Sequence, residues 1–427
     1  MSLLLRNGRL LDPKSKTDSL VDLSIRNTTI EHIANANSLD AKKYERVIDA
    51  SGLWITPGFI DLHVHLREPG EEYKEDIATG SKAAALGGFT TILAMPNTKP
   101  AIDTAELITY VMQRGKTVGL CRVLTTGAAT VARKSEQLAP LREMFHAGAV
   151  GFTDDGSPVA TAELMRSVLE YSLGLGVPVM THAEDTSLSK SGDMHEGALS
   201  TKLGLRGIPR AAEDIAVARD ITLADYTRAH LHVCHVSTLG AVELIRRAKH
   251  AGVHITAEAA PHHFSLTHLA VSMYDTNSKM NPPLREEHDV TAVVDGLKDG
   301  TLDAIATDHA PHSTVEKDVP FAEAANGIIG LQTALPLSLN LWRNHNMPLL
   351  DCVARLTTGP AQVLGKDLGT LAPGKTADVV LIDPNKTWTL TKDMVASKSK
   401  NSPFLGQALT GAAVATIYAG AVVCDNR

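Results

Sequence analysis

The sequence contains little cysteine, few aromatic residues and no long hydrophobic run. Four of its 427 residues are cysteines, and they lie far apart without a CxxC pair: Cys121, Cys234, Cys352 and Cys424. This spacing argues against a zinc ribbon and favours reduced thiols in a cytoplasmic protein. Aromatic residues make up only 4% of the chain, so no platform for stacked nucleic-acid bases is visible.

Charge and hydrophobicity exclude two further classes of protein. The formal net charge is −7 and no basic stripe occurs, which argues against a nucleic-acid partner. No apolar stretch reaches the length of about eighteen residues that a membrane-spanning helix needs. The N-terminal run MSLLL is too short for a secretory signal. We therefore expect a globular protein that partners neither nucleic acid nor membrane.

The two ends of the chain resemble each other and differ from the middle. Residues 1–56 and 366–427 contain short β-like segments separated by polar turns. Neither group is long enough to bury a core alone. We therefore predict that the two ends pair into one small composite β-sandwich domain.

The middle of the chain, residues 57–365, alternates short β-like runs with helical patterns. The candidate strands lie at 59–66, 89–96, 119–127, 149–155, 177–184, 230–237, 254–263 and 302–312. Residues 76–88 form one helical pattern and end on a Gly pair suited to a helix C-cap. Parallel strands joined by crossovers are expected, and eight such units favour a (β/α)8 barrel of the TIM type. The main rival is an open doubly wound sheet, but no glycine-rich phosphate turn follows the first strand.

Histidine and aspartate recur where these strands end, which is where a barrel places its active site. These residues are His63 and His65, Asp154 and Asp155, His182, His235 and Asp308. Imidazoles and carboxylates without thiolate suit zinc, or manganese or cobalt. Four imidazoles with two or more carboxylates make at least six ligands, which is too many for one tetrahedral ion, so we predict two metal ions that share a carboxylate.

Each residue also has an ordinary structural interpretation when it is taken alone. The chain has 18 histidines, of which most must be structural or exposed, and an aspartate pair can simply cap a helix. Arg67 could be a surface charge, or could hold an anion just beyond the HxH pair. Cys234 precedes His235 on a strand and is expected to face the core. The joint placement of ligand types at several strand ends favours the metal site; His262, His263 and His309 are expected bystanders.

Seven motifs in order resemble class I dihydroorotases of the amidohydrolase superfamily. They are DLHVHLREPG, AALGGFTTILAMPNTKP, GFTDDG, THAED, CHVST, KMNPPLR and ATDHAPH. The likeness covers nearly the whole chain, including both ends. It implies reversible closure of N-carbamoyl-L-aspartate to L-dihydroorotate with loss of water, the third step of de novo pyrimidine biosynthesis. The resemblance further implies a hydroxide bridging two zinc ions.

The resemblance also implies a role for each site residue. One zinc ion would be held by His63, His65 and Asp308, the other by His182 and His235, and Asp155 would bridge them where most relatives use a carboxylated lysine. Asp308 would act as base and then as acid. Substrate contacts would come from His65, Arg67, Asn97, Asn281, His312 and the backbone near Asn326 and Gly327. The family usually has Phe-Gly at the last position, and this chain has Asn-Gly.

Two other functions remain open at this point. The first is another cyclic amidase, such as a hydantoinase or allantoinase; the missing bridging lysine and the HLREPG motif count against it. The second is a non-catalytic partner of aspartate carbamoyltransferase, which would be expected to lose metal ligands, whereas all six positions are filled here. The sequence does not distinguish a homodimer from a complex with that transcarbamoylase.

Overall fold

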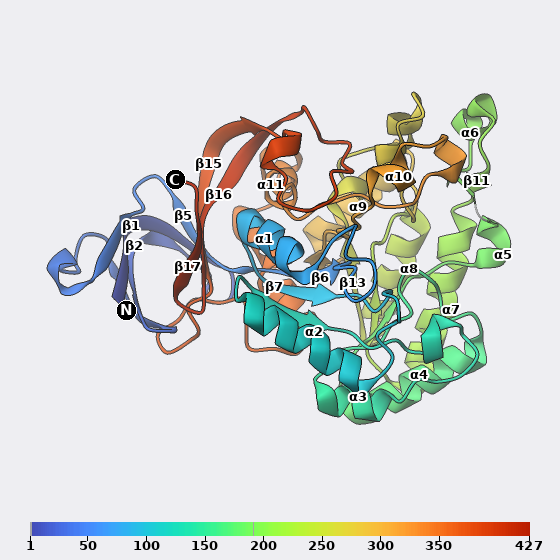
Figure 1. Ribbon diagram of the computed structural model, residues 1–427, viewed down its shortest axis with the longest axis horizontal. Coiled ribbons are helices and arrows are strands. Elements are labelled where there is room, and N and C mark those ends of the chain that lie inside the picture. The colour runs from blue at the N-terminus through green and yellow to red at the C-terminus, as the bar shows by residue number, and fades with distance from the viewer. Residues whose placement is uncertain (1, 191) are drawn as a thin grey trace.

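Strands from both ends of the chain share one sheet in the structure, a computed structural model that describes residues 2–190 and 192–427. The sheet lies at one end of the molecule, beside both described termini (Figure 1). Its strands are β1 (Ser2–Asp12), β2 (Thr17–Arg26), β3 (Thr29–Asn35), β4 (Arg46–Asp49), β5 (Trp54–Pro57), β15 (Val379–Thr389), β16 (Ala408–Tyr418) and β17 (Ala421–Asp425). The order is β17-β16-β15-β5-β1-β2-β3, and β4 pairs with β1.

The join between the two ends is the antiparallel pair β5–β15. Its register places Pro57 opposite Val379 and Trp54 opposite Ile382. An apolar cluster beneath the sheet draws residues from both ends of the chain, including Leu3, Leu23, Ile55, Leu381 and Ile417. Burial of this shared cluster removes apolar surface from water that neither end could bury alone.

Parallel strands occupy the middle of the molecule. One sheet has the order β6-β7-β8 and a second has the order β14-β13-β12-β9. Their bounds are β6 (Phe59–Val64), β7 (Phe89–Ala94), β8 (Arg122–Thr125), β9 (Val179–Thr181), β12 (Leu231–Val233), β13 (Ile255–Ala259) and β14 (Ala304–Ile305). A separate parallel pair is formed by β10 (Met194–His195) and β11 (Gly207–Ile208).

Isolated bridges connect the edges of these two parallel sheets. Val64 at the end of β6 bridges His309, just beyond β14. On the other side, Phe152 bridges both Gly127 and Val179. Residues 149–155 were expected to form a strand, and the structure has only these single bridges there. The backbone still joins this segment to β9, because the Phe152 amide donates to the Pro178 carbonyl and the Phe152 carbonyl accepts from the Met180 amide.

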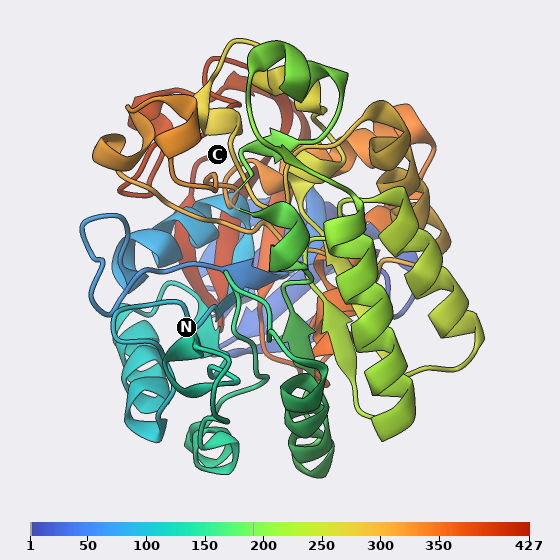
Figure 2. The same cartoon turned by 90° about the vertical axis from the view of Figure 1, so that its right-hand side faces the viewer.

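Helices surround the parallel strands (Figure 2). They are α1 (Ile77–Gly87), α2 (Ala105–Val118), α3 (Leu141–Ala147), α4 (Ala162–Leu175), α5 (Thr186–Ser189), α6 (Ala198–Leu203), α7 (Ala211–Thr227), α8 (Leu239–His250), α9 (Glu287–Asp299), α10 (Thr314–Lys317), α11 (Ala334–His345), α12 (Leu349–Leu356) and α13 (Thr358–Val363). Short 3-10 helices are η1 (Ala41–Lys43), η2 (Val131–Arg133), η3 (Pro261–His263), η4 (His268–Val271), η5 (Thr276–Ser278), η6 (Phe321–Glu323) and η7 (Lys392–Met394). Among the described residues, no helix is long and apolar enough to cross a membrane.

The sequence sets the helix ends in a direct way. Asp76 accepts a hydrogen bond from the Thr79 amide at the start of α1, and Gly88 ends it with φ 89°, as the predicted Gly C-cap requires. Thr104 caps α2 in the same way through the amide of Leu107. The side-chain caps fix where α1 and α2 begin, and Gly88 fixes where α1 ends and the chain enters β7.

Candidate metal centre and substrate pocket

The two histidines of the HxH pair lie where β6 ends. Their ring centroids are 5.2 Å apart and both side chains are buried. Asp61, two residues before His63, accepts bonds from the Thr307 amide at 3.0 Å and the Thr307 hydroxyl at 2.6 Å. This bond ties the start of the HxH segment to the residue before Asp308, so strand ends far apart in the sequence are held together.

Asp155 lies among four imidazoles. Its Oδ2 is 3.2 Å from His63 Nε2 and 3.6 Å from His65 Nε2. Its Oδ1 is 3.6 Å from His235 Nε2 and 3.8 Å from His182 Nδ1. One carboxylate oxygen therefore faces the histidines from β6, and the other faces the histidines that follow β9 and β12.

Asp308 closes the first of these two groups. Its Oδ1 is 3.0 Å from His65 Nε2 and 3.6 Å from His63 Nε2. Burial raises the pKa of Asp308, but the adjacent imidazoles outweigh it and hold that pKa below its usual value. The same opposition holds the pKa of Asp155 well below its usual value, and the Asp155 charge holds the pKa of His63 above its ordinary value.

The donor set fits divalent metal ions. His63 Nε2 and Asp155 Oδ1 are buried without a hydrogen-bond partner among the described residues. His182 Nδ1 and His235 Nε2 face each other at 3.0 Å. Buried nitrogen and oxygen atoms that converge without enough donors are expensive in a protein interior, and a zinc-like cation between them satisfies their lone pairs.

Cys234 lies near this cluster but has different surroundings. It is within ligand distance of His63 and Glu258 and belongs to an apolar cluster with Met180 and Ala304. Burial raises the pKa of its thiol, so the thiolate that a metal requires is disfavoured. The structure agrees with the expectation that Cys234 is a core residue.

A pocket of about 210 Å³ opens onto the histidine and aspartate cluster. It is lined by His65, Arg67, Asn97, Asp155, Gly156, His182, His235, Asn281, Asp308, Ala310, His312, Asn326 and Gly327. All the predicted substrate-contact residues lie on this wall. His63 does not line the pocket, but it contacts Asp155, which does.

Arg67 is the positive side chain of this pocket and is buried. Its Nε donates to the Pro311 carbonyl at 3.2 Å, and its Nη2 is 3.2 Å from His312 Nε2. Burial lowers the pKa of Arg67, although a guanidinium stays charged at neutral pH. Burial and the Arg67 charge together lower the pKa of His312 to about 2. His312 is therefore neutral, and its Nε2 lone pair can accept a hydrogen bond from the guanidinium.

Amide side chains occupy two further walls of the pocket. The Asn97 Oδ1 is 2.7 Å from His65 Nδ1. Asn281 Nδ2 donates to Glu184 Oε2 at 2.9 Å, and the same carboxylate oxygen is 3.0 Å from His182 Nε2. These contacts orient one imidazole from each group, with Asn97 and Asn281 both on the pocket wall.

The Asn-Gly departure from the family pattern lies at the pocket rim. Gly327 has φ 126°, and a Cβ there would come within 2.6 Å of the Ala310 Cβ, so this position requires glycine. The Gly327 amide donates to the Lys279 carbonyl at 2.9 Å. The Gly327 N–H is therefore already hydrogen-bonded within the protein. Of the pair, only Asn326 can be replaced by another residue type, as it is in the family pattern.

Sequence reasoning missed two residues that support the site. Asn401 accepts a bond from the His312 amide at 3.1 Å and donates to the Ala310 and Gly327 carbonyls at 3.0 Å. It comes from the C-terminal segment that was assigned to the β domain, and no local signal in the sequence marks it. Glu258 contacts His63 Nδ1 at 3.0 Å; a carboxylate inside the apolar strand ITAEA was the available signal.

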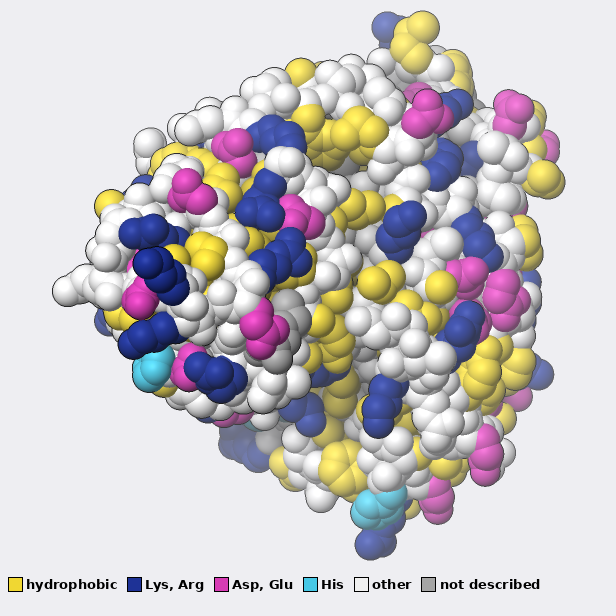
Figure 3. Space-filling view, turned by 60° about the vertical axis from the view of Figure 1, so that its left-hand side comes forward, with side chains coloured by type: hydrophobic (Ala, Val, Ile, Leu, Met, Phe, Trp, Pro, Cys, Tyr) yellow, Lys and Arg dark blue, Asp and Glu magenta, His cyan; other side chains and the backbone are white. Residues whose placement is uncertain are grey.

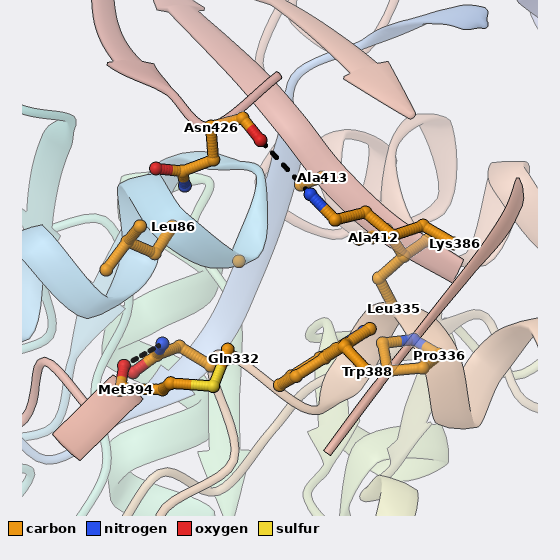
Figure 4. Close-up of a pocket in the computed structure, with 11 residues that line it drawn as sticks. Leu86, Gln332, Leu335, Pro336, Lys386, Trp388, Met394, Ala412, Ala413 and Asn426 are labelled. Carbon is orange, nitrogen blue, oxygen red and sulfur yellow. Dashed lines mark hydrogen bonds between the residues drawn. The ribbon is translucent and has the colours of Figure 1, made fainter. Parts of the chain in front are cut away.

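A second cavity of about 350 Å³ lies between α1, α11, β15 and β16 (Figure 4). Its lining is mainly apolar and includes Leu86, Leu335, Trp388 and Met394. Its polar groups are already paired: Lys386 Nζ donates to the Asn426 carbonyl and Gln332 Nε2 to the Met394 carbonyl. The outer face that carries the composite sheet mixes basic and acidic side chains (Figure 3). Because the larger cavity is mainly apolar and its polar groups are paired, the candidate metal ligands lie at the smaller, polar pocket.

Comparison with known proteins gives a consistent set of relatives. A model described as the amidohydrolase family matches residues 54–423. Dihydroorotases of Pelobacter propionicus and Geobacter metallireducens are 53% and 52% identical over 423 residues, covering 99% of this chain and 99% of each relative. An L-hydantoinase structure from Arthrobacter aurescens superposes with a TM-score of 0.88 at 25% identity, covering 99% of this chain and 96% of that one. A dihydropyrimidinase structure from Brevibacillus agri gives 0.85 at 24% identity, covering 100% and 95%.

Proposed function

The chain belongs to the amidohydrolase family, and we propose that it is a dihydroorotase that interconverts N-carbamoyl-L-aspartate and L-dihydroorotate in pyrimidine biosynthesis. One observation carries the choice of substrate. The buried guanidinium of Arg67 and the cluster around Asp155 share the wall of one small pocket. A substrate that carries a carboxylate beside a cyclic amide is complementary to that pairing. The relatives that are about half identical over their full length bear the same name.

The fold that supports this site is proposed to be a closed (β/α)8 barrel, residues 57–365, with residues 1–56 and 366–427 as a separate composite β domain. The bridges from Val64 to His309 and from Phe152 to Gly127 and Val179 support closure. One apolar cluster has members from β6, β7, β8, β14 and α13. This cluster also supports barrel closure, because the interior of such a barrel is a packed core.

Two zinc ions are the cofactor we propose for this site. His63, His65 and Asp308 would hold one ion, His182 and His235 the other, and Asp155 both. The two oxygens of Asp155, each directed at a different histidine pair, support a shared carboxylate. When bound, such a pair supplies Lewis-acid polarisation of the amide carbonyl and a water of lowered pKa.

The four free cysteines support a reducing, cytoplasmic setting for the protein.

Arg67 positions the substrate in this proposal. A guanidinium can pair with a carboxylate through two parallel N–H···O bonds, which fixes orientation as well as distance. The N–H of the neutral His312 beside it and the Asn97 side-chain NH2 would add hydrogen-bond donors around the same carboxylate. Because Arg67 follows the HxH pair by two residues, the anchor and the reacting amide are held by one segment of the chain.

Asp308 moves the proton. Its depressed pKa keeps it ionised, so it can accept a proton from the attacking water in the hydrolytic direction. It then donates that proton to the ring nitrogen as the amide bond breaks. Its Oδ1 contact with His65 at 3.0 Å holds the carboxylate at the pocket wall. The reverse order of the same two transfers closes the ring.

A substrate panel tests the proposal. Purified zinc-loaded protein should hydrolyse L-dihydroorotate and close N-carbamoyl-L-aspartate. It should act at least a hundredfold more slowly on hydantoin, allantoin and dihydrouracil, which lack the carboxylate that Arg67 would hold. Faster turnover of hydantoin or dihydrouracil would favour the cyclic-amidase alternative suggested by the hydantoinase fold relatives. Zinc-loaded protein without turnover of any of these would favour a non-catalytic partner.

A further inference from the structure

A chain of polar side chains leads away from His63 along β12 and β13. His63 Nδ1 lies 3.0 Å from Glu258 Oε1, and Glu258 Oε2 lies 3.0 Å from His232 Nε2. His232 Nδ1 lies 2.9 Å from Thr256 Oγ1, which in turn lies 2.8 Å from His230 Nε2. We call Glu258, His232, Thr256 and His230 the polar column. It runs from the carboxyl ends of the strands toward their amino ends.

The strand register produces this arrangement. His232 and Thr256 are paired across β12 and β13, and Glu258 follows Thr256 by two residues on the same face. His232 also pairs with Met180, and Glu258 pairs with Ala304. Met180 and Ala304 belong to an apolar cluster. The column is therefore a line of polar groups beside apolar packing, which is costly unless every group is satisfied.

The bonding pattern fixes the proton on each group. An ionised Glu258 can only accept, so it accepts hydrogen bonds from the N–H groups at His63 Nδ1 and His232 Nε2. His232 Nδ1 then carries a lone pair and accepts from the Thr256 hydroxyl. Thr256 has one proton, so its oxygen accepts from His230 Nε2. With Nδ1 protonated, His63 presents the Nε2 lone pair toward Asp155 and the proposed metal.

We propose that the polar column holds His63 in this tautomer and ring orientation, with His232 as a positioning residue that acts through Glu258. The inference rests on the proposed metal-dependent function and adds residues that the seven motifs did not assign. A carboxylate behind a metal-bound imidazole raises the basicity of that imidazole, and its loss typically weakens metal affinity 10- to 100-fold. Here a second imidazole orients that carboxylate in turn.

His182, in the other proposed metal group, is also backed by a carboxylate, but no line of polar groups continues behind it in the same way. Glu184 contacts His182 Nε2 at 3.0 Å, and the same carboxylate also accepts a bond from Asn281 in the substrate pocket at 2.9 Å. Substrate contacts can therefore disturb that support, whereas the column behind His63 lies on the side away from the pocket wall. We expect the ion held by His63 to be the one whose affinity the column sets.

Zinc affinity measured by competition with a chromogenic chelator tests the column on the full-length protein. Glu258→Gln should weaken the affinity for one zinc ion by 10- to 100-fold, because the nearly isosteric amide can accept from only one of the two imidazoles. His232→Leu should weaken it less, by about three- to tenfold. His232→Gln places an amide donor near the position of Nε2 and should restore affinity to within about twofold of the parent.

The matched control is Asp12→Asn, which changes a fully buried carboxylate in the composite sheet to an amide and should leave zinc affinity unchanged. The KM for L-dihydroorotate at saturating zinc should stay within about twofold in all variants, because Arg67 is untouched. Parent-like zinc affinity in Glu258→Gln would overturn the inference, as would equal losses in His232→Leu and His232→Gln. A parent protein that neither binds zinc nor hydrolyses dihydroorotate would instead overturn the proposed function.

Discussion

Asp154 and Asp155 are neighbours in the chain with opposite surroundings. Asp154 accepts bonds from the amide and hydroxyl of Thr130 at 3.0 and 2.5 Å, which ties the loop before η2 to this segment. Asp155 instead points at the four imidazoles. Strand alternation implies that the two side chains diverge, but it cannot say which one faces the site. The sequence resemblance chose Asp155, and the geometry supports the same choice.

Separate alanine variants distinguish the proposed metal-bridging role of Asp155 from the structural role of Asp154. Asp155→Ala should lose bound zinc and activity together, because the ions would repel each other without the shared carboxylate. Asp154→Ala should keep its zinc and lose about 1–3 kcal/mol of folding stability through its broken hydrogen bonds. Metal analysis and rate measurements on both purified variants check this. An Asp154→Ala protein empty of zinc would contradict the assignment.

Arg67 is predicted to be the carboxylate anchor. Arg67→Lys should raise the KM for L-dihydroorotate by roughly thirtyfold, equivalent to about 2 kcal/mol, because lysine cannot form the two-point pair. The slow turnover of dihydrouracil, which lacks the carboxylate, should not fall further. Steady-state kinetics with both substrates measure this. A lysine variant with the parent KM would show that Arg67 does not hold the carboxylate.

Asp308 is predicted to transfer the proton. Asp308→Asn keeps an oxygen beside His65 but cannot accept a proton, so turnover should fall by at least ~10²–10⁴. The protein should still bind zinc, since the histidine ligands remain. Zinc content and kcat measured on the same preparation check both statements. Near-parent turnover would remove Asp308 from the proposed mechanism.

At the scale of elements, the buried Lys317 amine links α10 (Thr314–Lys317) to the pocket rim by hydrogen bonds. Lys317 Nζ donates to the carbonyls of Thr276, Lys279 and Ala325 at 2.9, 3.2 and 2.7 Å. Ala325 directly precedes the Asn-Gly pair, and Lys279 accepts the Gly327 amide. One side chain therefore joins the segment after Asp308 to the segment that leads to Asn281.

Loss of this fastening should loosen the substrate wall. Lys317→Met removes a donor from three carbonyls. Those of Thr276 and Lys279 each keep a backbone amide donor, whereas that of Ala325 loses its Lys317 bond, and an unsatisfied buried group costs about 1–3 kcal/mol. We expect the KM for L-dihydroorotate to rise at least fivefold, with zinc content unchanged. Lys298→Met, on the outer side of α9 beside Asp295, is the control. Equal KM values in the two variants would show that Lys317 does not order the wall.

The sequence predicted elements better where local chemistry decides them. The capped helix at residues 76–88 and the histidine-bearing strand at 59–66 follow from an Asp cap, a Gly pair and an apolar run. The segment 149–155 was expected to be a strand, but the structure has only isolated bridges there. Asn401 was missed because its partners Ala310 and Gly327 are 91 and 74 residues away, and no local pattern records such a pairing.

At the scale of the whole molecule, the C-terminal segment supports a pocket that the middle of the chain builds. The β5–β15 pair joins the ends, while Asn401 extends from the C-terminal segment to hold the rim beside His312. The convergence of histidines and aspartates around Asp155 could be predicted from residue types at strand ends, whereas the supporting contacts depend on packing that only the structure gives.

Zinc titration into metal-free protein tests the central claim most directly. The rate of L-dihydroorotate hydrolysis should be near zero without zinc and should rise until two ions are bound per chain. The rate on dihydrouracil should stay at least a hundredfold lower throughout. Full dihydroorotate hydrolysis by metal-free protein, or faster turnover of dihydrouracil by the zinc-loaded protein, would contradict the account.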